Sequence, residues 1–159
     1  MSSLAEAIKQ KKQAWLNYRK VSRFEIADWN NKVRELYEQI KEWLKPFEND
    51  GLLRFEEESV PVDYFLEEEV VSDNTEVKEC LTIKFFNGQT IEFEPVGFNV
   101  VGGYGRLDMQ LGLRKIMIVL KERDGDWIFT ERYGLEKTPT YDFNQDSFEQ
   151  IVTEFVESF

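Results

Sequence analysis

Residues 102–108 combine glycines with charged side chains that could bind or transform a ligand. The segment is Gly102-Gly103-Tyr104-Gly105-Arg106-Leu107-Asp108. Glycines let backbone N–H groups approach a ligand, an arginine can clamp a carboxylate or phosphate, and an aspartate can act as a base or orient the arginine. One hypothesis is therefore a small-ligand pocket between sheet and helices. Its predicted ligand-binding residues are Tyr104, Arg106, Asp108, Phe98 and Trp127.

A purely structural explanation competes with this hypothesis. The segment lacks the Gly-Lys-Ser/Thr of a phosphate-binding loop, and no helix is expected after it. Glycine within a strand commonly marks a bulge or turn, and Arg106 and Asp108, two residues apart on one face, can pair with each other or with a neighbouring strand. We favour this structural explanation.

Glutamates gather in two triplets, at positions 56–58 and 67–69. Grouped carboxylates can bind a divalent cation, but these lack the Asp-x-Asp-x-Asp-Gly spacing of a calcium loop, and we expect no metal site. A solvated strand edge whose like charges discourage further pairing is the favoured interpretation. The same carboxylates are alternatively a docking surface for a basic protein. Its predicted residues are Glu56, Glu58, Asp63, Glu67, Glu69, Glu92 and Glu94.

The chain contains no histidine and only one cysteine, Cys80. Zinc sites, Ser-His-Asp catalysis and Cys-His catalysis are therefore excluded unless a site is built from carboxylates alone. Cys80 is expected to pack as a small apolar residue, and no cofactor is expected. The N-terminus has no apolar segment of signal-peptide length, and no run of about 18 apolar residues occurs, so we expect a cytoplasmic protein without membrane contact.

The net charge of −11 is unevenly distributed along the chain. Residues 1–45 hold ten Lys/Arg against six Asp/Glu, a balance of +4, whereas residues 46–159 hold ten against 25, a balance of −15. An acidic body repels nucleic-acid phosphates and anionic membranes, so direct nucleic-acid binding is not expected, and it attracts a basic protein.

Two helices are predicted in residues 3–45. Capping boxes begin at Ser3 and at Ser22, which favours a break between two helices, and Pro46 is expected to end the second. The alternative is a single helix of about forty residues that forms a coiled-coil dimer. Three tryptophans at 14-residue steps serve as core anchors, or as a dimer or partner groove where exposed. They are Trp15, Trp29 and Trp43.

Two hairpin signals organise the middle of the chain. Asn87-Gly88 and Asp124-Gly125 lie between alternating apolar residues, a pattern typical of two-residue turns. Residues 52–60 and 62–71 are expected to form an edge hairpin around Pro61. The run Ile116–Leu120 is apolar throughout, so we expect both faces of that strand to be covered.

These patterns predict a single α+β domain over residues 1–159. It comprises an N-terminal helical pair (1–47) packed on the sheet, an antiparallel β-meander of five to seven strands (51–133) and a C-terminal amphipathic helix (146–158) capped by Asp146.

Acidity, the absence of histidine and the lack of a catalytic pattern favour a protein-binding module over an enzyme. Such a module acts as an inhibitor, immunity factor, chaperone or adaptor, and it docks to a protein partner of basic charge. The chain is expected to be a monomer or a homodimer through the N-terminal helices. Two alternatives stay open: a small-ligand-binding domain or histidine-free enzyme with a pocket near residues 102–108, and an acidic mimic of nucleic acid.

Overall fold

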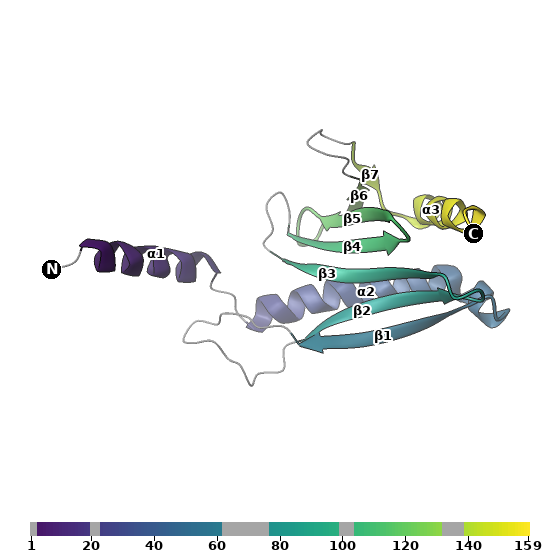
Figure 1. Ribbon diagram of the computed structural model, residues 1–159, viewed down its shortest axis with the longest axis horizontal. Coiled ribbons are helices and arrows are strands. Elements are labelled where there is room, and N and C mark those ends of the chain that lie inside the picture. The colour runs from purple at the N-terminus through teal and green to yellow at the C-terminus, as the bar shows by residue number, and fades with distance from the viewer. Residues whose placement is uncertain (1–2, 20–22, 62–76, 99–103, 132–138) are drawn as a thin grey trace.

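A computed structural model describes residues 3–19, 23–61, 77–98, 104–131 and 139–159 (Figure 1). Its helices are α1 (Ser3–Arg19), α2 (Arg23–Asn49) and α3 (Gln145–Glu157). Its strands are β1 (Leu53–Pro61), β2 (Val77–Phe85), β3 (Thr90–Phe98), β4 (Gly105–Leu111), β5 (Arg114–Leu120), β6 (Trp127–Thr130) and β7 (Tyr141–Asp142). The predicted α+β fold is thereby confirmed. No helix among these residues is long and apolar enough to cross a membrane.

The strands form one antiparallel meander in which each strand pairs with the next along the chain. Asn87-Gly88 closes the β2–β3 hairpin as predicted, but three residues separate Phe85 from its partner Gln89. Gly88 has φ of 88°, a left-handed conformation that glycine adopts without steric cost. The sequence therefore predicted the position of this turn correctly, but the turn contains three residues instead of two.

Two other connections differ from the sequence prediction. Asp124-Gly125 lies within a six-residue connection, 121–126, between β5 and β6. The two-residue turn is found instead between β4 and β5, where Leu111 pairs with Arg114 across Gly112 and Leu113. Gly112 has φ of 60°, which closes this turn. The second strand of the predicted edge hairpin, residues 62–71, lies outside the described residues.

One face of the sheet carries the core. Alternate residues of the strands are buried there beneath α2 and α3, as the alternation predicted, while their neighbours form an opposite face that no described helix covers. We call this second face the open face. The strand residues that build the hydrophobic core are Leu53, Leu81, Ile83, Phe85, Ile91, Phe93, Leu107, Met109, Leu111, Ile116, Ile118, Leu120 and Phe129.

The strand β5 is not covered on both faces, contrary to the prediction. Ile116, Ile118 and Leu120 are buried, but Met117 and Val119 are only half-buried on the open face. Neighbouring side chains of the same face shield these two residues in part, so an unbroken apolar run does not require a second covering layer.

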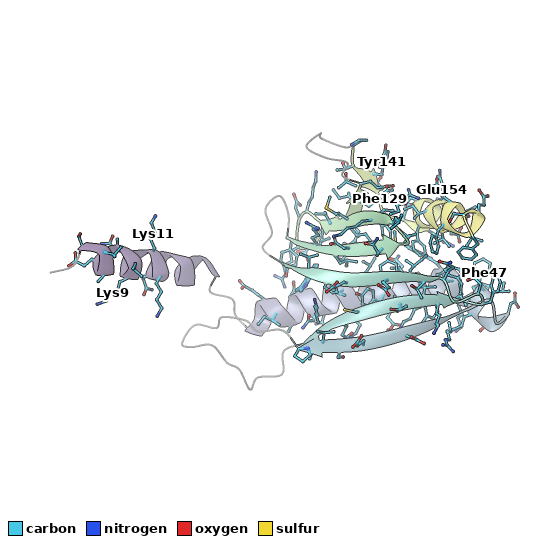
Figure 2. All side chains as sticks on the ribbon, viewed as in Figure 1. Lys9, Lys11, Phe47, Phe129, Tyr141 and Glu154 are labelled. Carbon is cyan, nitrogen blue, oxygen red and sulfur yellow. The ribbon has the colours of Figure 1, made fainter. Side chains whose placement is uncertain are left out.

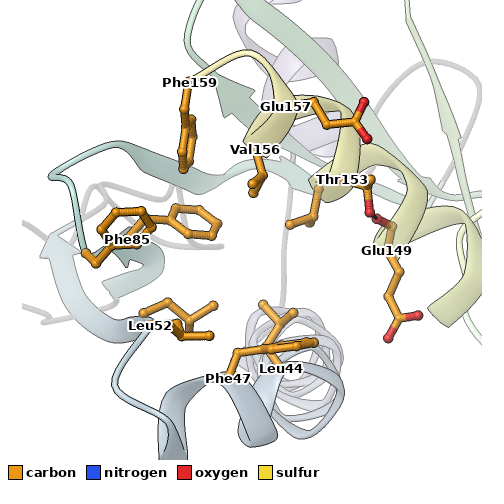
Figure 3. A pocket seen from close by; sticks show the side chains of 12 residues that line it. Leu44, Phe47, Leu52, Phe85, Glu149, Thr153, Val156, Glu157 and Phe159 are labelled. Carbon is orange, nitrogen blue, oxygen red and sulfur yellow. Dashed lines mark hydrogen bonds between the residues drawn. The ribbon is translucent and has the colours of Figure 1, made fainter.

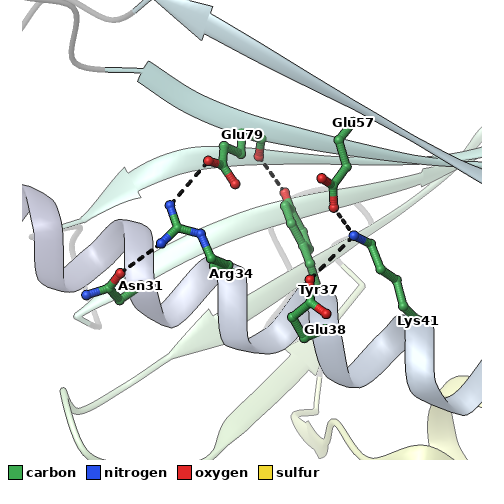
Figure 4. Close-up of polar contacts among 7 residues, drawn as sticks. All are labelled: Asn31, Arg34, Tyr37, Glu38, Lys41, Glu57 and Glu79. Carbon is green, nitrogen blue, oxygen red and sulfur yellow. Dashed lines mark hydrogen bonds and ion pairs between the residues drawn. The ribbon is translucent and has the colours of Figure 1, made fainter.

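The helix α2 crosses the sheet with a buried stripe at three- and four-residue steps, namely Ile26, Trp29, Val33, Leu36, Tyr37, Ile40 and Leu44. Its polar residues fasten it to the first two strands (Figure 4). The Tyr37 hydroxyl donates to the Glu79 carbonyl at 2.8 Å, Arg34 pairs with the Glu79 carboxylate at 3.3 Å, and Lys41 pairs with Glu57.

Pro46 does not end α2, contrary to the prediction. The helix continues to Asn49, and Gly51 follows with φ of 72°. Proline removes a single backbone donor, and a loss within the last turn leaves most of the helix intact. This short extension matters because it places Phe47 beside the start of β1.

The helix α1 does not pack on the sheet, which overturns half of the predicted helical packing. It lies beyond the N-terminal end of α2 and projects away from it (Figure 1). Lys9 and Lys11 extend from α1 in a region where no strand lies nearby (Figure 2). All side chains from Ser3 to Gln13 are exposed. The break between two helices was predicted correctly, because α2 begins at Arg23.

The helix α3 is capped by Asn144 rather than by Asp146. The Asn144 side chain accepts from the Ser147 N–H at 2.9 Å, and the Ser147 hydroxyl accepts from the Asn144 N–H at 3.0 Å. This reciprocal pair is a capping box. It directs α3 across the sheet so that Phe148, Ile151, Val152 and Phe155 are buried.

Candidate functional site

An apolar pocket of about 530 Å³ opens on the described part of the molecule (Figure 3). It lies where the end of α2, the start of β1, the β2–β3 hairpin and α3 converge. We call it the α2–α3 pocket. Its lining residues are Leu44, Phe47, Leu52, Leu53, Phe85, Phe86, Glu149, Val152, Thr153, Val156, Glu157 and Phe159.

Large apolar side chains of this pocket are open to solvent. Phe86 is 72% exposed, Phe159 is 43% exposed and Phe47 is 42% exposed, and Leu52 and Val156 are exposed as well. Single exposed apolar residues are ordinary on a protein surface, but a contiguous group from four separate elements is the kind of surface that proteins use to bind partners. In Figure 3 the labelled apolar side chains surround one shared space, and the carboxylates of Glu149 and Glu157 are turned away from its centre.

Stacked aromatic rings give the pocket a firm wall. The Phe85 ring lies 5.4 Å from that of Phe159 and 6.0 Å from that of Phe155, and Phe155 lies 5.3 Å from Phe159. The Phe85–Phe159 and Phe155–Phe159 pairs meet edge to face, the arrangement that the ring quadrupole favours. Phe159 is thereby packed against two neighbouring rings on one side of the pocket.

One side of the pocket is acidic. The helix α3 carries four acidic residues and no basic one, and two of them, Glu149 and Glu157, line the pocket. Glu154 is already paired, because Arg114 of β5 bonds it at 2.7 Å and also bonds Glu131. These carboxylates hold the pKa of Arg114 above its usual range. Glu157 has no ion pair among the described residues, so its charge is available to a partner.

The opposite side, across Phe85 and Phe86, has charges of both signs. A second depression there is lined by Glu48, Arg54 and Lys84, and it shares both phenylalanines with the α2–α3 pocket. Arg54 pairs with Glu56 at 3.2 Å. A ligand with a basic face is therefore best accommodated on the α3 side.

The predicted ligand-binding residues do not converge on one pocket. Tyr104 and Trp127 both contact Trp29 of α2, with ring centroids 6.2 Å and 6.0 Å away. Arg106 and Asp108 lie on the open face, where they pair with each other at 2.9 Å, as the structural explanation expected. Tyr104 precedes β4 and its side chain contacts α2, whereas Arg106 lies on the open face, so these two predicted residues do not share a pocket. The side chain of Phe98 lies outside the described residues.

Tyr104 takes part in a polar cluster with Asp28 and Arg123. Its hydroxyl donates to Asp28 Oδ2 at 2.5 Å, and Arg123 donates to both carboxylate oxygens at 3.0 and 3.1 Å. The hydrogen bonds from Arg123 and then Tyr104 hold the pKa of Asp28 below its ordinary value. Burial and the neighbouring carboxylate raise the pKa of Tyr104, which stays a donor. The cluster ties α2 to the β5–β6 connection.

Most predicted partner-binding glutamates lie on the open face, where basic residues offset them. Glu94 pairs with Lys78 at 2.6 Å and Glu56 with Arg54, while Glu58 and Glu92 have no ion pair among the described residues. The open face also holds the basic residues Lys84, Arg106 and Lys115. Asp63, Glu67 and Glu69 lie outside the described residues. The described part of this face is therefore mixed in charge rather than uniformly acidic.

Cys80 lies on the open face between Glu58 and Glu94 of the neighbouring strands. Burial and the surrounding carboxylates raise the pKa of its thiol, which disfavours the reactive thiolate. No group of three or more potential metal ligands occurs among the residues that the structure describes.

The sequence interpretation missed the α2–α3 pocket, although two signals pointed to it. Leu52-Leu53 and Phe85-Phe86 are consecutive apolar pairs at strand ends. Because successive strand residues face opposite ways, one member of each pair cannot enter the core by strand alternation alone. Those members, Leu52 and Phe86, are the exposed ones that line the pocket.

Comparisons of the chain with protein-family models, with curated proteins and with solved structures find no match. The function proposed next therefore rests on the geometry and charge of the α2–α3 pocket.

Proposed function

We propose that this chain is a protein-binding module whose α2–α3 pocket receives apolar side chains from a basic amphipathic helix of its partner. The observation that carries the proposal is the contiguous exposed apolar surface formed by Phe47, Leu52, Phe86, Val156 and Phe159. A helix that lays its apolar face into a groove is a recurrent mode of peptide recognition.

Burial of these side chains supplies the affinity. Each large apolar residue that moves from water into a packed interface contributes about 1.5–3 kcal/mol. Aromatic anchors in pockets dominate measured interface energies, and the pocket offers three exposed phenylalanines, Phe47, Phe86 and Phe159.

Charge selects the partner. The unpaired Glu157, and Glu149 about two turns earlier in α3, favour lysine or arginine on the side of the incoming helix that faces α3. The balance of −15 over residues 46–159 attracts a basic protein over a longer range. Association is therefore fast at low salt and slower when salt screens these charges.

The test compares two exposed apolar residues, one inside the pocket and one outside it. Phe86→Glu introduces a charge into the pocket, whereas Leu113→Glu makes a similar change at the fully exposed β4–β5 turn. Capture of partners from native lysate, read by quantitative mass spectrometry, should lose a protein with Phe86→Glu and retain it with Leu113→Glu. Equal retention by both variants would refute the pocket as the docking site.

The same experiment includes a charge test. Glu149→Lys combined with Glu157→Lys should reduce capture at low salt by an order of magnitude or more, with a smaller effect at high salt, because the exposed charges are then screened. An unchanged salt dependence would remove α3 from the interface.

A small apolar ligand is the second candidate function for this pocket. Its volume of about 530 Å³ is in the range of small-molecule sites, and its lining is mainly apolar. Native mass spectrometry distinguishes the two functions, because a bound small molecule adds a fixed mass that Phe86→Glu would remove.

A further inference from the structure

The helix α1 has two large aliphatic side chains that are open to solvent. Leu4 is 68% exposed and Ile8 is 59% exposed, and the two lie one helical turn apart on one face. The helix has four basic residues, Lys9, Lys11, Lys12 and Arg19, against the single acidic Glu6. It is a basic helix with two exposed aliphatic side chains, which is the chemistry that the α2–α3 pocket favours.

We propose that α1 of one copy docks into the α2–α3 pocket of a second copy. Leu4 and Ile8 would enter between Phe86 and Val156, and lysines of α1 would face Glu149 and Glu157 of α3. Charge complementarity supports this occupant, since α3 has acidic residues only and α1 has a net positive charge. The inference rests on the proposed function, because it names a second copy of this chain as one partner of the same pocket.

The length of α2 indicates that the α1 in the pocket comes from a second copy rather than from the same chain. The pocket lies at the C-terminal end of α2, and α1 precedes its N-terminal end. At 1.5 Å per residue the 27 residues of α2 span about 40 Å, and the 17 residues of α1 span about 25 Å. To reach its own pocket, α1 would have to fold back along all of α2 on a fully extended connection, whereas it projects away from α2 (Figure 1).

A mutual exchange of α1 between two copies gives a closed dimer. If each copy gives its α1 and receives that of its partner, the two identical contacts are related by a two-fold axis and no pocket is left empty. The expected species is a homodimer. The sequence left open a monomer or a homodimer through the N-terminal helices, and the dimer proposed here instead forms through contacts between α1 and the pocket.

The first test measures molar mass by sedimentation equilibrium of the full chain over a range of concentrations. Wild type and Leu113→Glu should give the mass of two chains, whereas Leu4→Glu with Ile8→Glu, and separately Phe86→Glu with Val156→Glu, should each give a monomer. All of these residues are exposed, and circular dichroism melting checks that each variant stays folded. A monomeric wild type at all concentrations would overturn the inference.

Mixing the two monomeric variants provides a sharper test. One retains an intact pocket and the other an intact α1, so an equimolar mixture should form a heterodimer through a single contact. The heterodimer should be at least tenfold weaker than the wild-type dimer, because one contact of two is lost. Mixtures that stay monomeric while wild type is dimeric would place the dimer contact elsewhere and refute the exchange.

The same variants separate this inference from the proposed function. The α1 variant, Leu4→Glu with Ile8→Glu, should still capture a foreign partner, because its pocket is unchanged. Pocket-dependent capture by a chain that is always monomeric would refute the α1 exchange alone. Capture that is unaffected by Phe86→Glu would refute the proposed pocket function, whatever the oligomeric state.

Discussion

Gly105 shows how one residue sets the distance between α2 and the sheet. It is the first residue of β4, and a Cβ placed there would overlap the Trp29 ring, with Cε3 only 2.6 Å away. The conformation of Gly105 is ordinary, so its requirement for glycine comes from space rather than from backbone strain. The glycine-rich segment thus contributes to the packing of Trp29, Tyr104 and Trp127.

Gly105→Ala is expected to destabilise the fold by about 1–3 kcal/mol, because the added methyl group overpacks the Trp29 contact. Urea denaturation measures the change. As a control, the same substitution in a Trp29→Leu background should cost clearly less, since leucine leaves room. An equal cost in both backgrounds would mean that Gly105 does not act through Trp29.

Asp28 gives the fold a defined dependence on acid. Its pKa is lowered in the folded state by Arg123 and Tyr104, so the folded protein binds this proton more weakly than the unfolded chain does. The contribution of the Asp28 carboxylate to the free energy of unfolding is fully present above its pKa in the unfolded chain, near 3.8. It is lost as pH falls through the lower pKa of the folded state.

Asp28→Asn should therefore be less stable than wild type near neutral pH, and the difference should shrink as pH falls from about 5 to about 2. Chemical denaturation over this range measures it. Glu35→Gln, which removes an exposed carboxylate of the same helix outside this cluster, serves as the control. A constant difference between wild type and Asp28→Asn would contradict the assigned ion pair.

At the scale of elements, the attachment of α3 depends on its first turn. The Asn144–Ser147 capping box satisfies backbone groups that would otherwise lack partners. The helix then presents Phe148 to Phe93, with ring centroids 6.4 Å apart. Because α3 forms one side of the pocket, weakening its start also weakens the site.

Asn144→Ala is expected to cost about 1 kcal/mol, the usual effect of losing an N-cap side chain. Hydrogen exchange of the α3 amides should accelerate more than that of β3 and β4. Gln150→Ala, at an exposed position within α3, is the matched control and should change little. Uniform acceleration across the whole sheet would show that α3 does not open separately.

Elements that follow a strict period could be predicted from the sequence. The stripes of α2 and α3, the alternation of β2 and β3 and the Asn87-Gly88 hairpin were all identified, because each depends on local patterning. The end of α2 was misjudged, since a proline in a final turn removes only one hydrogen bond. The Gly112-Leu113 turn was missed because a single glycine is a weaker signal than Asn-Gly.

At the scale of the whole molecule, the sequence could not predict which surfaces stay uncovered. Phe47, Phe86 and Phe159 are far apart in the chain. Only the tertiary arrangement brings them together at the edge of the core, where they remain open to solvent. The charge of the predicted acidic surface likewise depends on the tertiary structure, because adjacent strands place basic residues on the same open face.

The most direct test of the central claim is a hydrogen–deuterium exchange footprint of the full chain with the protein partner that Phe86→Glu fails to capture. Binding in the α2–α3 pocket should slow exchange in residues 47–53, in the β2–β3 hairpin and along α3, and leave the Gly112-Leu113 turn unchanged. Protection confined to β4 and β5, with none in α3 or the β2–β3 hairpin, would contradict the account and place the interface on the open face.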